Sequence, residues 1–140
     1  MSVYLHCNVT TPQTFSPLQG RPKPLWAPLY QLYETAMTWS QALFFCRKNE
    51  NDLAAVTNME EQRQLEVIIS PSAMYATWIG LKRMGTTVWM WSEGIGPVTL
   101  FPFSASESAG DCAWMDQSGY WHADLCSSRR SFVCFKCKWQ

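Results

Sequence analysis

Six cysteines are the feature that most limits how this 140-residue chain can fold. They are Cys7, Cys46, Cys112, Cys126, Cys134 and Cys137. An even number of cysteines is typical of a disulfide framework in an oxidising compartment. Six cysteines allow fifteen pairings, and their spacing alone does not choose among them.

Zinc binding is the alternative explanation for the cysteines. A structural zinc site needs two close Cys/His pairs, but only Cys134 and Cys137 have that spacing, because His6 and Cys7 are adjacent. A redox-active Cys-x-x-Cys pair would need a strand-to-helix junction, whereas this pair lies in a strand-like run near the end of the chain. Disulfides are therefore the better account, and the sequon Asn8-Val9-Thr10 agrees with secretion.

The first twenty residues do not resemble a secretory leader. Met1 to Gly20 contain neither a basic region nor a continuous apolar stretch. We therefore expect a secreted protein or the ectodomain of a larger membrane protein. Either this chain is a piece of that longer protein, or its gene model starts too late. A leaderless intracellular protein is the remaining alternative. No apolar run approaches 18 residues, so we expect no membrane-spanning segment.

The charge balance limits the classes of partner. Eleven basic and eleven acidic side chains give a formal net charge of zero, which argues against nucleic acid because that partner needs a basic face. Apolar residues make up 47% of the chain, so we expect one folded domain rather than disorder.

The chain begins with a proline-rich segment. Residues 1–28 contain five prolines without clear periodicity, which indicates an extended arm or linker. A strand is predicted at residues 29–33, which are rich in aromatic strand formers. Thr38 and Gln41 form a capping box that predicts a helix to about Asn49. Its inward-facing residues should be Trp39, Ala42, Phe45 and Cys46.

A second capping box at Thr57 and Glu60 predicts a helix from about residue 58 to residue 69, closed by Pro71. The residues available to pack are Met59, Leu65, Ile68 and Ile69. Beyond this helix we expect short strands at 75–81, 88–91, 112–115, 120–122 and 131–136, with a long irregular segment at 92–111. Two helices followed by several short strands indicate an α+β fold.

The order of short motifs from about Leu29 to Lys136 resembles that of the C-type lectin-like domain family. The matching pieces are Thr38–Ala42 with Cys46, Asp52–Ala54, Trp78–Leu81, Trp89–Gly94, Cys112, Gly119–Trp121, Cys126 and Phe132–Cys134. The resemblance implies two helices flanking small antiparallel sheets, with a long irregular loop. It divides the chain into an arm or linker, residues 1–28, and the lectin-like domain, residues 29–137.

The same resemblance implies the disulfides Cys46–Cys134 and Cys112–Cys126. Cys7 and Cys137 are left over. We expect them to pair with each other and to fasten the arm to the last strand. The alternative is a disulfide-linked dimer through Cys7 or Cys137.

Sugar-binding members of the family use a Ca²⁺ ion held by carboxylate and amide side chains, and most of these ligands are absent here. Glu107 matches the family glutamate, but the proline and asparagine that follow it are replaced by Ser108 and Ala109. The asparagine and aspartate of the family's Trp-Asn-Asp motif are replaced by His122 and Ala123.

The remaining carboxylates do not restore the calcium site. Gly110 stands where the family has an acid, although Asp111 follows it. Asp124 lies one position late, and in a strand it points to the face opposite Ala123. Ca²⁺ needs six to eight oxygen ligands, so we expect no cofactor and no calcium. A rearranged site that uses Glu107, Asp111 and Asp124 is the alternative.

The candidate binding residues lie on the long loop and the neighbouring strands. They are Phe101, Phe103, Glu107, Asp111, Trp114, His122 and Asp124. Each has a structural alternative: the aromatic residues can be core, and the acids can be solvated. His122 would donate a hydrogen bond where a calcium ligand once stood. Core positions are expected for Trp78, Trp89, Trp91 and Trp121, and a solvated turn for Arg129 and Arg130.

These observations predict a non-catalytic extracellular recognition module that binds a protein, or a glycan without the usual calcium site. The alternative is a calcium-dependent carbohydrate-binding lectin with an altered site. An enzyme is not expected, because His6 and His122 are the only histidines and neither lies near an identifiable nucleophile.

Overall fold

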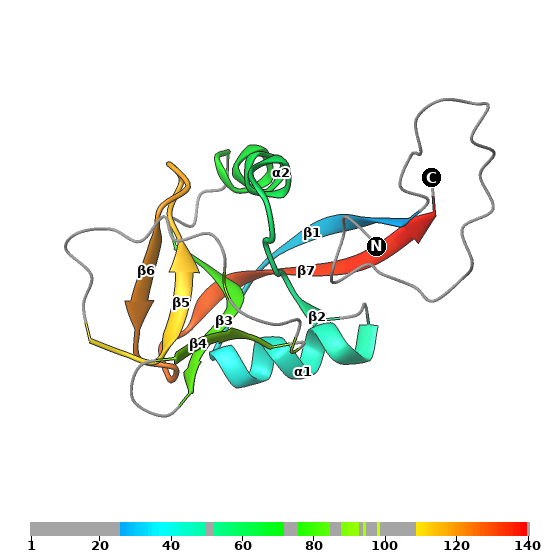
Figure 1. Ribbon diagram of the computed structural model, residues 1–140. Coiled ribbons are helices and arrows are strands. Elements are labelled where there is room, and N and C mark those ends of the chain that lie inside the picture. Colours follow the sequence, from blue (N-terminus) through cyan, green and yellow to red (C-terminus); the bar gives the residue numbers. More distant parts are fainter. Residues whose placement is uncertain are drawn as a thin grey trace, which may run out of the picture.

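The computed structural model describes residues 26–49, 52–71, 76–84, 88–92, 94, 98 and 109–139. Its elements are β1 (Trp26–Met37), α1 (Trp39–Asn49), β2 (Asp52–Leu53), α2 (Met59–Ile69), β3 (Thr77–Met84), β4 (Val88–Trp91), β5 (Cys112–Met115), β6 (Trp121–Asp124) and β7 (Arg130–Trp139). Two helices and a mainly antiparallel sheet confirm the predicted α+β class (Figure 1). Neither described helix is long and apolar enough to cross a membrane.

One sheet connects all seven strands. Its main path runs β1-β7-β3-β5-β6, while β2 pairs with β7 and β4 pairs with β3. Among the described strands, only β3 and β7 pair in parallel; the other pairs are antiparallel. β1 and β7 lie side by side along their length (Figure 1), and both are longer than the sequence predicted. The strand β2 was not predicted.

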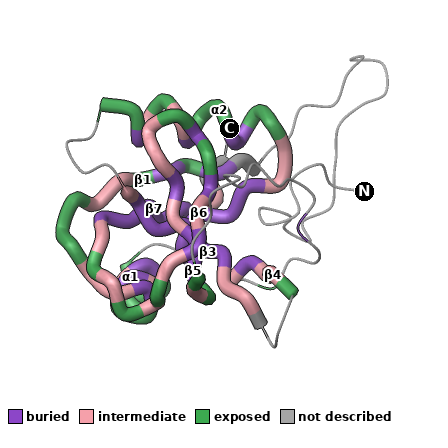
Figure 2. Tube along the Cα trace, turned by 90° about the vertical axis from the view of Figure 1, so that its left-hand side faces the viewer, coloured by how far each residue is buried: buried purple, intermediate pink, exposed green. Residues whose placement is uncertain are grey.

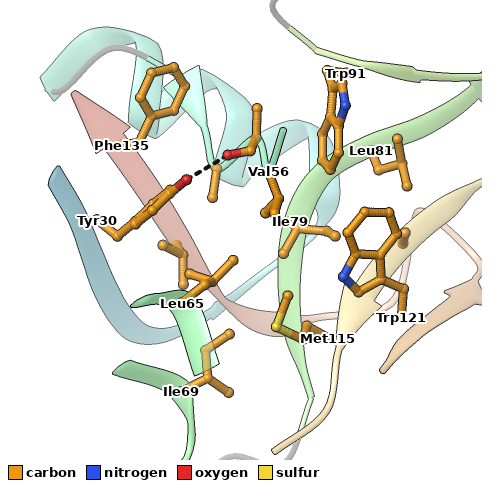
Figure 3. Packing of buried hydrophobic residues seen from close by; sticks show 14 of the residues in the cluster. Tyr30, Val56, Leu65, Ile69, Ile79, Leu81, Trp91, Met115, Trp121 and Phe135 are labelled. Atoms are coloured by element: carbon orange, nitrogen blue, oxygen red, sulfur yellow. Dashed lines mark hydrogen bonds between the residues drawn. The ribbon is translucent and has the colours of Figure 1, made fainter. Parts of the chain in front are cut away.

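The alternation of side chains along the strands divides the core into two clusters on opposite faces of the sheet. The first cluster lies beneath α2 and includes Leu65, Ile79, Met115, Trp121 and Phe135 (Figure 3). The second lies between α1 and the sheet and includes Trp39, Cys46, Trp78, Phe132 and Cys134. Figure 1 shows the two helices on opposite sides of the sheet, and Figure 2 shows the buried residues concentrated on the central strands.

The first helix begins as its sequence predicts. The backbone N–H of Thr38 donates to Gln41 Oε1 at 3.1 Å, and the N–H of Gln41 donates to Thr38 Oγ1 at 3.2 Å, so the capping box is confirmed. Trp39 is buried, and its Nε1–H donates to the carbonyl of Ile79 at 2.9 Å. This contact fixes α1 against β3.

The second helix begins one residue later than its predicted capping box. Asn58 is the N-cap residue, and its Oδ1 accepts from the N–H of Glu61 at 2.9 Å. Glu61 Oε1 in turn accepts from the N–H and hydroxyl of Thr57 at 2.9 and 2.8 Å. This register turns Glu61 toward the sheet. Burial raises the pKa of its carboxyl, and this effect outweighs the hydrogen bonds from Thr57, which lower that pKa. The prediction that Met59 packs inward was wrong, because this register leaves it exposed.

Both disulfides implied by the family resemblance are confirmed. Cys46–Cys134 joins α1 to β7, and Cys112–Cys126 joins β5 to the turn after β6. Cys137 is also disulfide-bonded. Its expected partner, Cys7, lies outside the described residues.

Candidate functional site

A row of aromatic side chains crosses the sheet on the face that α1 covers. Neighbouring strands contribute one ring each, and the register pairs them directly. In strand order the row is Tyr33 on β1, Phe132 on β7, Trp78 on β3, Trp114 on β5 and His122 on β6. Direct cross-strand pairs are close enough for aromatic contacts. The sheet register therefore brings together residues that lie far apart in the sequence.

Helix α1 covers only one end of this row. Phe45 packs edge-on against Tyr33 and Phe132, with ring centroids 4.9 and 5.4 Å apart. Trp78 is fully buried, whereas Trp114 and His122 are only partly buried. The β5–β6 end of the row is thus the part that a ligand could reach. We call Trp114, Asp116, Tyr120, His122, Asp124 and Arg130 the β5–β6 face.

Arg130 lies between two rings of the row. Its guanidinium carbon is 5.4 Å from the ring centroid of Trp78 and 4.6 Å from that of Trp114. The same guanidinium donates to the carboxylate of Asp124. Its stacking on two rings and its ion pair hold a positive charge in a fixed place on β7. The expectation of a solvated turn was wrong for Arg130, because that expectation ignored the sheet register.

His122 lies directly beside Trp114, because β6 pairs with β5 at this position. The two rings are stacked, with centroids 4.2 Å apart and planes at 17°. His122 Nε2 is 2.7 Å from Asp116 Oδ2. Asp116 Oδ1 also accepts from the N–H groups of Ser118 and Tyr120, at 2.8 and 3.0 Å. The turn between β5 and β6 therefore holds the histidine in position.

The two carboxylates of this face are stabilised in their charged form. Partial burial acts to raise the pKa of Asp124, but hydrogen bonds from Arg130, Leu125 and Ser128 and the positive charge of Arg130 outweigh it and lower that pKa. For Asp116, burial is likewise outweighed, by hydrogen bonds from His122, Tyr120 and Ser118 and by the charge of His122, so its pKa is also lowered. Both groups are therefore hydrogen-bond acceptors at neutral pH.

These lowered pKa values predict how the fold responds to acid. The two carboxylates stabilise the folded state above their unfolded-state pKa of about 3.9, and that stabilisation is lost as the pH falls through the lower folded-state pKa. We expect an Asp116→Asn/Asp124→Asn variant to lose about 1–2 kcal/mol of unfolding free energy at neutral pH. Its unfolding free energy should fall less steeply below about pH 4 than that of the parent chain.

Urea titrations at neutral and acidic pH, followed by tryptophan fluorescence, measure this difference. Glu60→Gln is a matched control, because Glu60 is an exposed carboxylate on α2, away from the β5–β6 face. The explanation fails if the double variant and the control have the same dependence on pH.

The β6 residues do not fit the family's calcium ion. Ala123 stands at one ligand position with a methyl group that is fully buried on the other face. His122 stands at the other, where its imidazole contacts Trp114 and Asp116. Asp124 does point to the face opposite Ala123, as predicted, but its carboxylate binds Arg130.

The calcium-ligating acid that the family has just before β5 is replaced here by Gly110, and the local backbone leaves no room for a side chain. The φ of Gly110 is +148°, and an added Cβ would lie 2.1 Å from the carbonyl carbon of Asp124. No side chain fits at this position while β6 stays in place. Within the described residues, no group of three or more His, Cys, Asp or Glu side chains could hold a metal ion. The expectation that the chain binds no calcium remains a prediction.

The structure gathers three of the seven predicted site residues: Trp114, His122 and Asp124. Asp111 is separate, because it forms an ion pair with Arg83 at 3.2 Å. Phe101, Phe103 and Glu107 lie outside the described residues. Two residues of this face, Arg130 and Asp116, were not predicted from the sequence. Residues two apart in a strand point to the same face of the sheet. This spacing could have identified both, since Arg130 precedes the inward-facing Phe132 by two residues and Asp116 follows Trp114 by two.

Comparisons with known proteins agree with the motifs. A protein-family model described as the lectin C-type domain matches residues 35–136. Lymphocyte antigen 75 of Mesocricetus auratus is 30% identical over 111 residues, which cover 77% of this chain and 6% of that protein. The secretory phospholipase A2 receptor of Oryctolagus cuniculus is 33% identical over 101 residues, which cover 71% and 7%. The chain thus spans only a small part of the length of these relatives.

The fold has close structural neighbours. Human lithostathine superimposes with a TM-score of 0.72 over 84% of this chain and 96% of its own, at 23% identity. At this identity the likeness concerns the fold alone. It matches the arrangement of two helices and a mainly antiparallel sheet described above.

Proposed function

Because the chain belongs to the C-type lectin domain family, as its motifs predicted, we propose that it is an extracellular recognition module that binds a protein or a glycan without calcium. Domains of this family are generally non-catalytic. Disulfides such as Cys46–Cys134 persist in oxidising compartments, which supports an extracellular location. A phospholipase A2 receptor among the relatives agrees with this location.

The observation that carries the proposal is the replacement of calcium ligands on β6 by an ordered set of protein groups. Where the family has an amide and a carboxylate, this chain has His122 and Ala123. His122, Trp114 and Arg130 are fixed by stacking, and the two aspartates by hydrogen bonds. A face whose side chains are already ordered loses little conformational entropy on binding.

This arrangement limits the contacts that a ligand can make. The imidazole of His122 stacks on Trp114, and the guanidinium of Arg130 lies over the same indole, so protein groups already occupy space where a sugar ring would stack. A ligand would instead meet the partly exposed carboxylates of Asp116 and Asp124 and the ring of Tyr120, which is 54% exposed. Tyrosine combines a large apolar area with a hydroxyl and is common at binding surfaces.

The test begins by probing an array of glycans and an array of extracellular proteins with the disulfide-intact domain in chelator. For any ligand found, Tyr120→Ser and Asp116→Asn should each weaken binding about tenfold or more, as expected for contacts at a recognition surface. Val67→Ser is the matched control, because Val67 is exposed on α2, on the other side of the sheet.

A second variant tests the long loop. Scrambling residues 101–109, with Gly110 and Asp111 kept in place, should abolish binding if the loop and the β5–β6 face act together. Binding that survives both the scrambled loop and Tyr120→Ser, or that appears only when calcium is added, would contradict the proposal.

A further inference from the structure

A second surface with the character of a binding site lies at the end of β1, beside the outer face of α1. An open hollow of about 620 Å³ is lined there by nine described residues, among them Met37, Phe44, Phe45, Lys48 and Arg129. None of the residues that line it belongs to the β5–β6 face. Its lining is mainly apolar, with charged groups from both α1 and the turn before β7.

The hollow exists because β1 departs from its register. β1 pairs regularly with β7 as far as Tyr33, and the register then shifts before Met37. Thr35 and Ala36 in this interruption are exposed and form part of the wall. A break in register bends a strand away from its neighbour. It therefore opens space between the strand and the helix that follows it.

The apolar part of the wall contains an unusually exposed aromatic ring. Phe44 is 69% exposed, although the adjacent Phe45 packs against Tyr33 and Phe132. A phenylalanine in water loses the stabilisation that burial would give it. Beside a hollow, such a ring is a ready contact for an apolar group of a partner.

The charged side chains that line the hollow are both cationic. Lys48 and Arg129 line it, and none of the nine lining residues is acidic. In the described part of the chain, neither of these two cations has an ion pair with a carboxylate, whereas Arg47, Arg83 and Arg130 each do. Arg129 donates to an amide oxygen, Gln41 Oε1, at 3.5 Å. The hollow is therefore complementary to an anion.

We propose that this hollow binds a short acidic peptide segment of a partner protein. An aromatic or aliphatic side chain of the segment would pack on Phe44, and its carboxylates would pair with Lys48 and Arg129. The mainly apolar wall favours a peptide over an anionic saccharide, which would leave Phe44 exposed. This interaction is additional to ligand binding at the β5–β6 face.

The test uses the disulfide-intact chain and a synthetic hexapeptide, Glu-Asp-Phe-Glu-Leu-Asp. Titration followed by NMR should shift the amide signals of α1 and of residues 35–37. Lys48→Glu/Arg129→Glu should weaken binding about tenfold or more, since two partly exposed ion pairs are lost and replaced by repulsion. Phe44→Ser should weaken it as well, and raised salt should reduce affinity.

Matched variants separate this site from general charge attraction. Arg63→Glu changes an exposed cation on α2 and should leave peptide binding unchanged. Tyr120→Ser should also leave it unchanged, so a failure here is distinct from a failure of the β5–β6 face. A control peptide with lysine in place of each acid should not bind.

Three results would overturn the proposal. The first is peptide affinity that is the same in Lys48→Glu/Arg129→Glu as in the parent chain. The second is a heparin hexasaccharide that binds the hollow more tightly than the peptide and independently of Phe44. The third is self-association that Phe44→Ser abolishes in sedimentation experiments, since the occupant would then be a second copy of this chain.

Discussion

Replacing Cys46 and Cys134 together by alanine is expected to lower the free energy of unfolding by about 4–5 kcal/mol. The two residues are 88 positions apart, and their disulfide restricts nearly the whole domain in the unfolded state. Both are fully buried where α1 meets the sheet, in the cluster that supports the aromatic row. Because small domains have only about 5–15 kcal/mol of stability, the variant should be close to unfolding at 37 °C.

Urea unfolding followed by tryptophan fluorescence measures this loss. The comparison variant replaces Cys112 and Cys126, which are 14 positions apart, and should lose about 3 kcal/mol. Equal losses in the two variants, or a larger loss for the shorter loop, would show that restriction of the unfolded chain does not explain the difference.

Gly110→Ala is the second change with a large expected effect. The backbone at Gly110 has φ +148°, and the new Cβ would lie 2.1 Å from the carbonyl carbon of Asp124. Backbone strain of about 1–3 kcal/mol adds to a similar cost for forcing β6 to move. The shift should also disturb the contact between Asp124 and Arg130, and hence the β5–β6 face.

Gly94→Ala is the matched control for this prediction. Gly94 also has positive φ, +74°, but an added Cβ there meets nothing within 4 Å. It should therefore lose only the strain of about 1–2 kcal/mol of a left-handed residue. Thermal unfolding of both variants measures the two losses of stability. If they lose the same stability, the close approach of Gly110 to β6 does not constrain this region.

Local patterns were sufficient to predict the elements that begin with strong signals. The capping box at Thr38 fixed the start of α1, and the motifs of the family resemblance identified both described disulfides. The start of α2 was predicted one residue early, at Thr57, whereas the structure uses Asn58, which is an equally good N-cap residue. Only the buried position of Glu61, which depends on the sheet beneath, selects Asn58.

The site could be predicted only in part, because it depends on which strands are neighbours. The placement of Asp124 opposite Ala123 followed from strand parity alone. Parity also puts Arg130 on the same face of the sheet as Phe132. Its contacts with Trp78 and Trp114 could not be predicted, because they require β3 to lie between β7 and β5. Two adjacent arginines in the sequence resemble an exposed turn, and only one of them is exposed.

The central claim, recognition without calcium, is tested most directly by thermal unfolding of the disulfide-intact domain in about 10 mM Ca²⁺ and again in chelator. Extracellular calcium modules have dissociation constants of roughly 10⁻⁴–10⁻³ M. At this concentration such a site would add about 1.4–2.7 kcal/mol, or several degrees in midpoint. We predict identical midpoints in the two solutions. A rise of several degrees in calcium that disappears in Glu107→Ala would contradict the account.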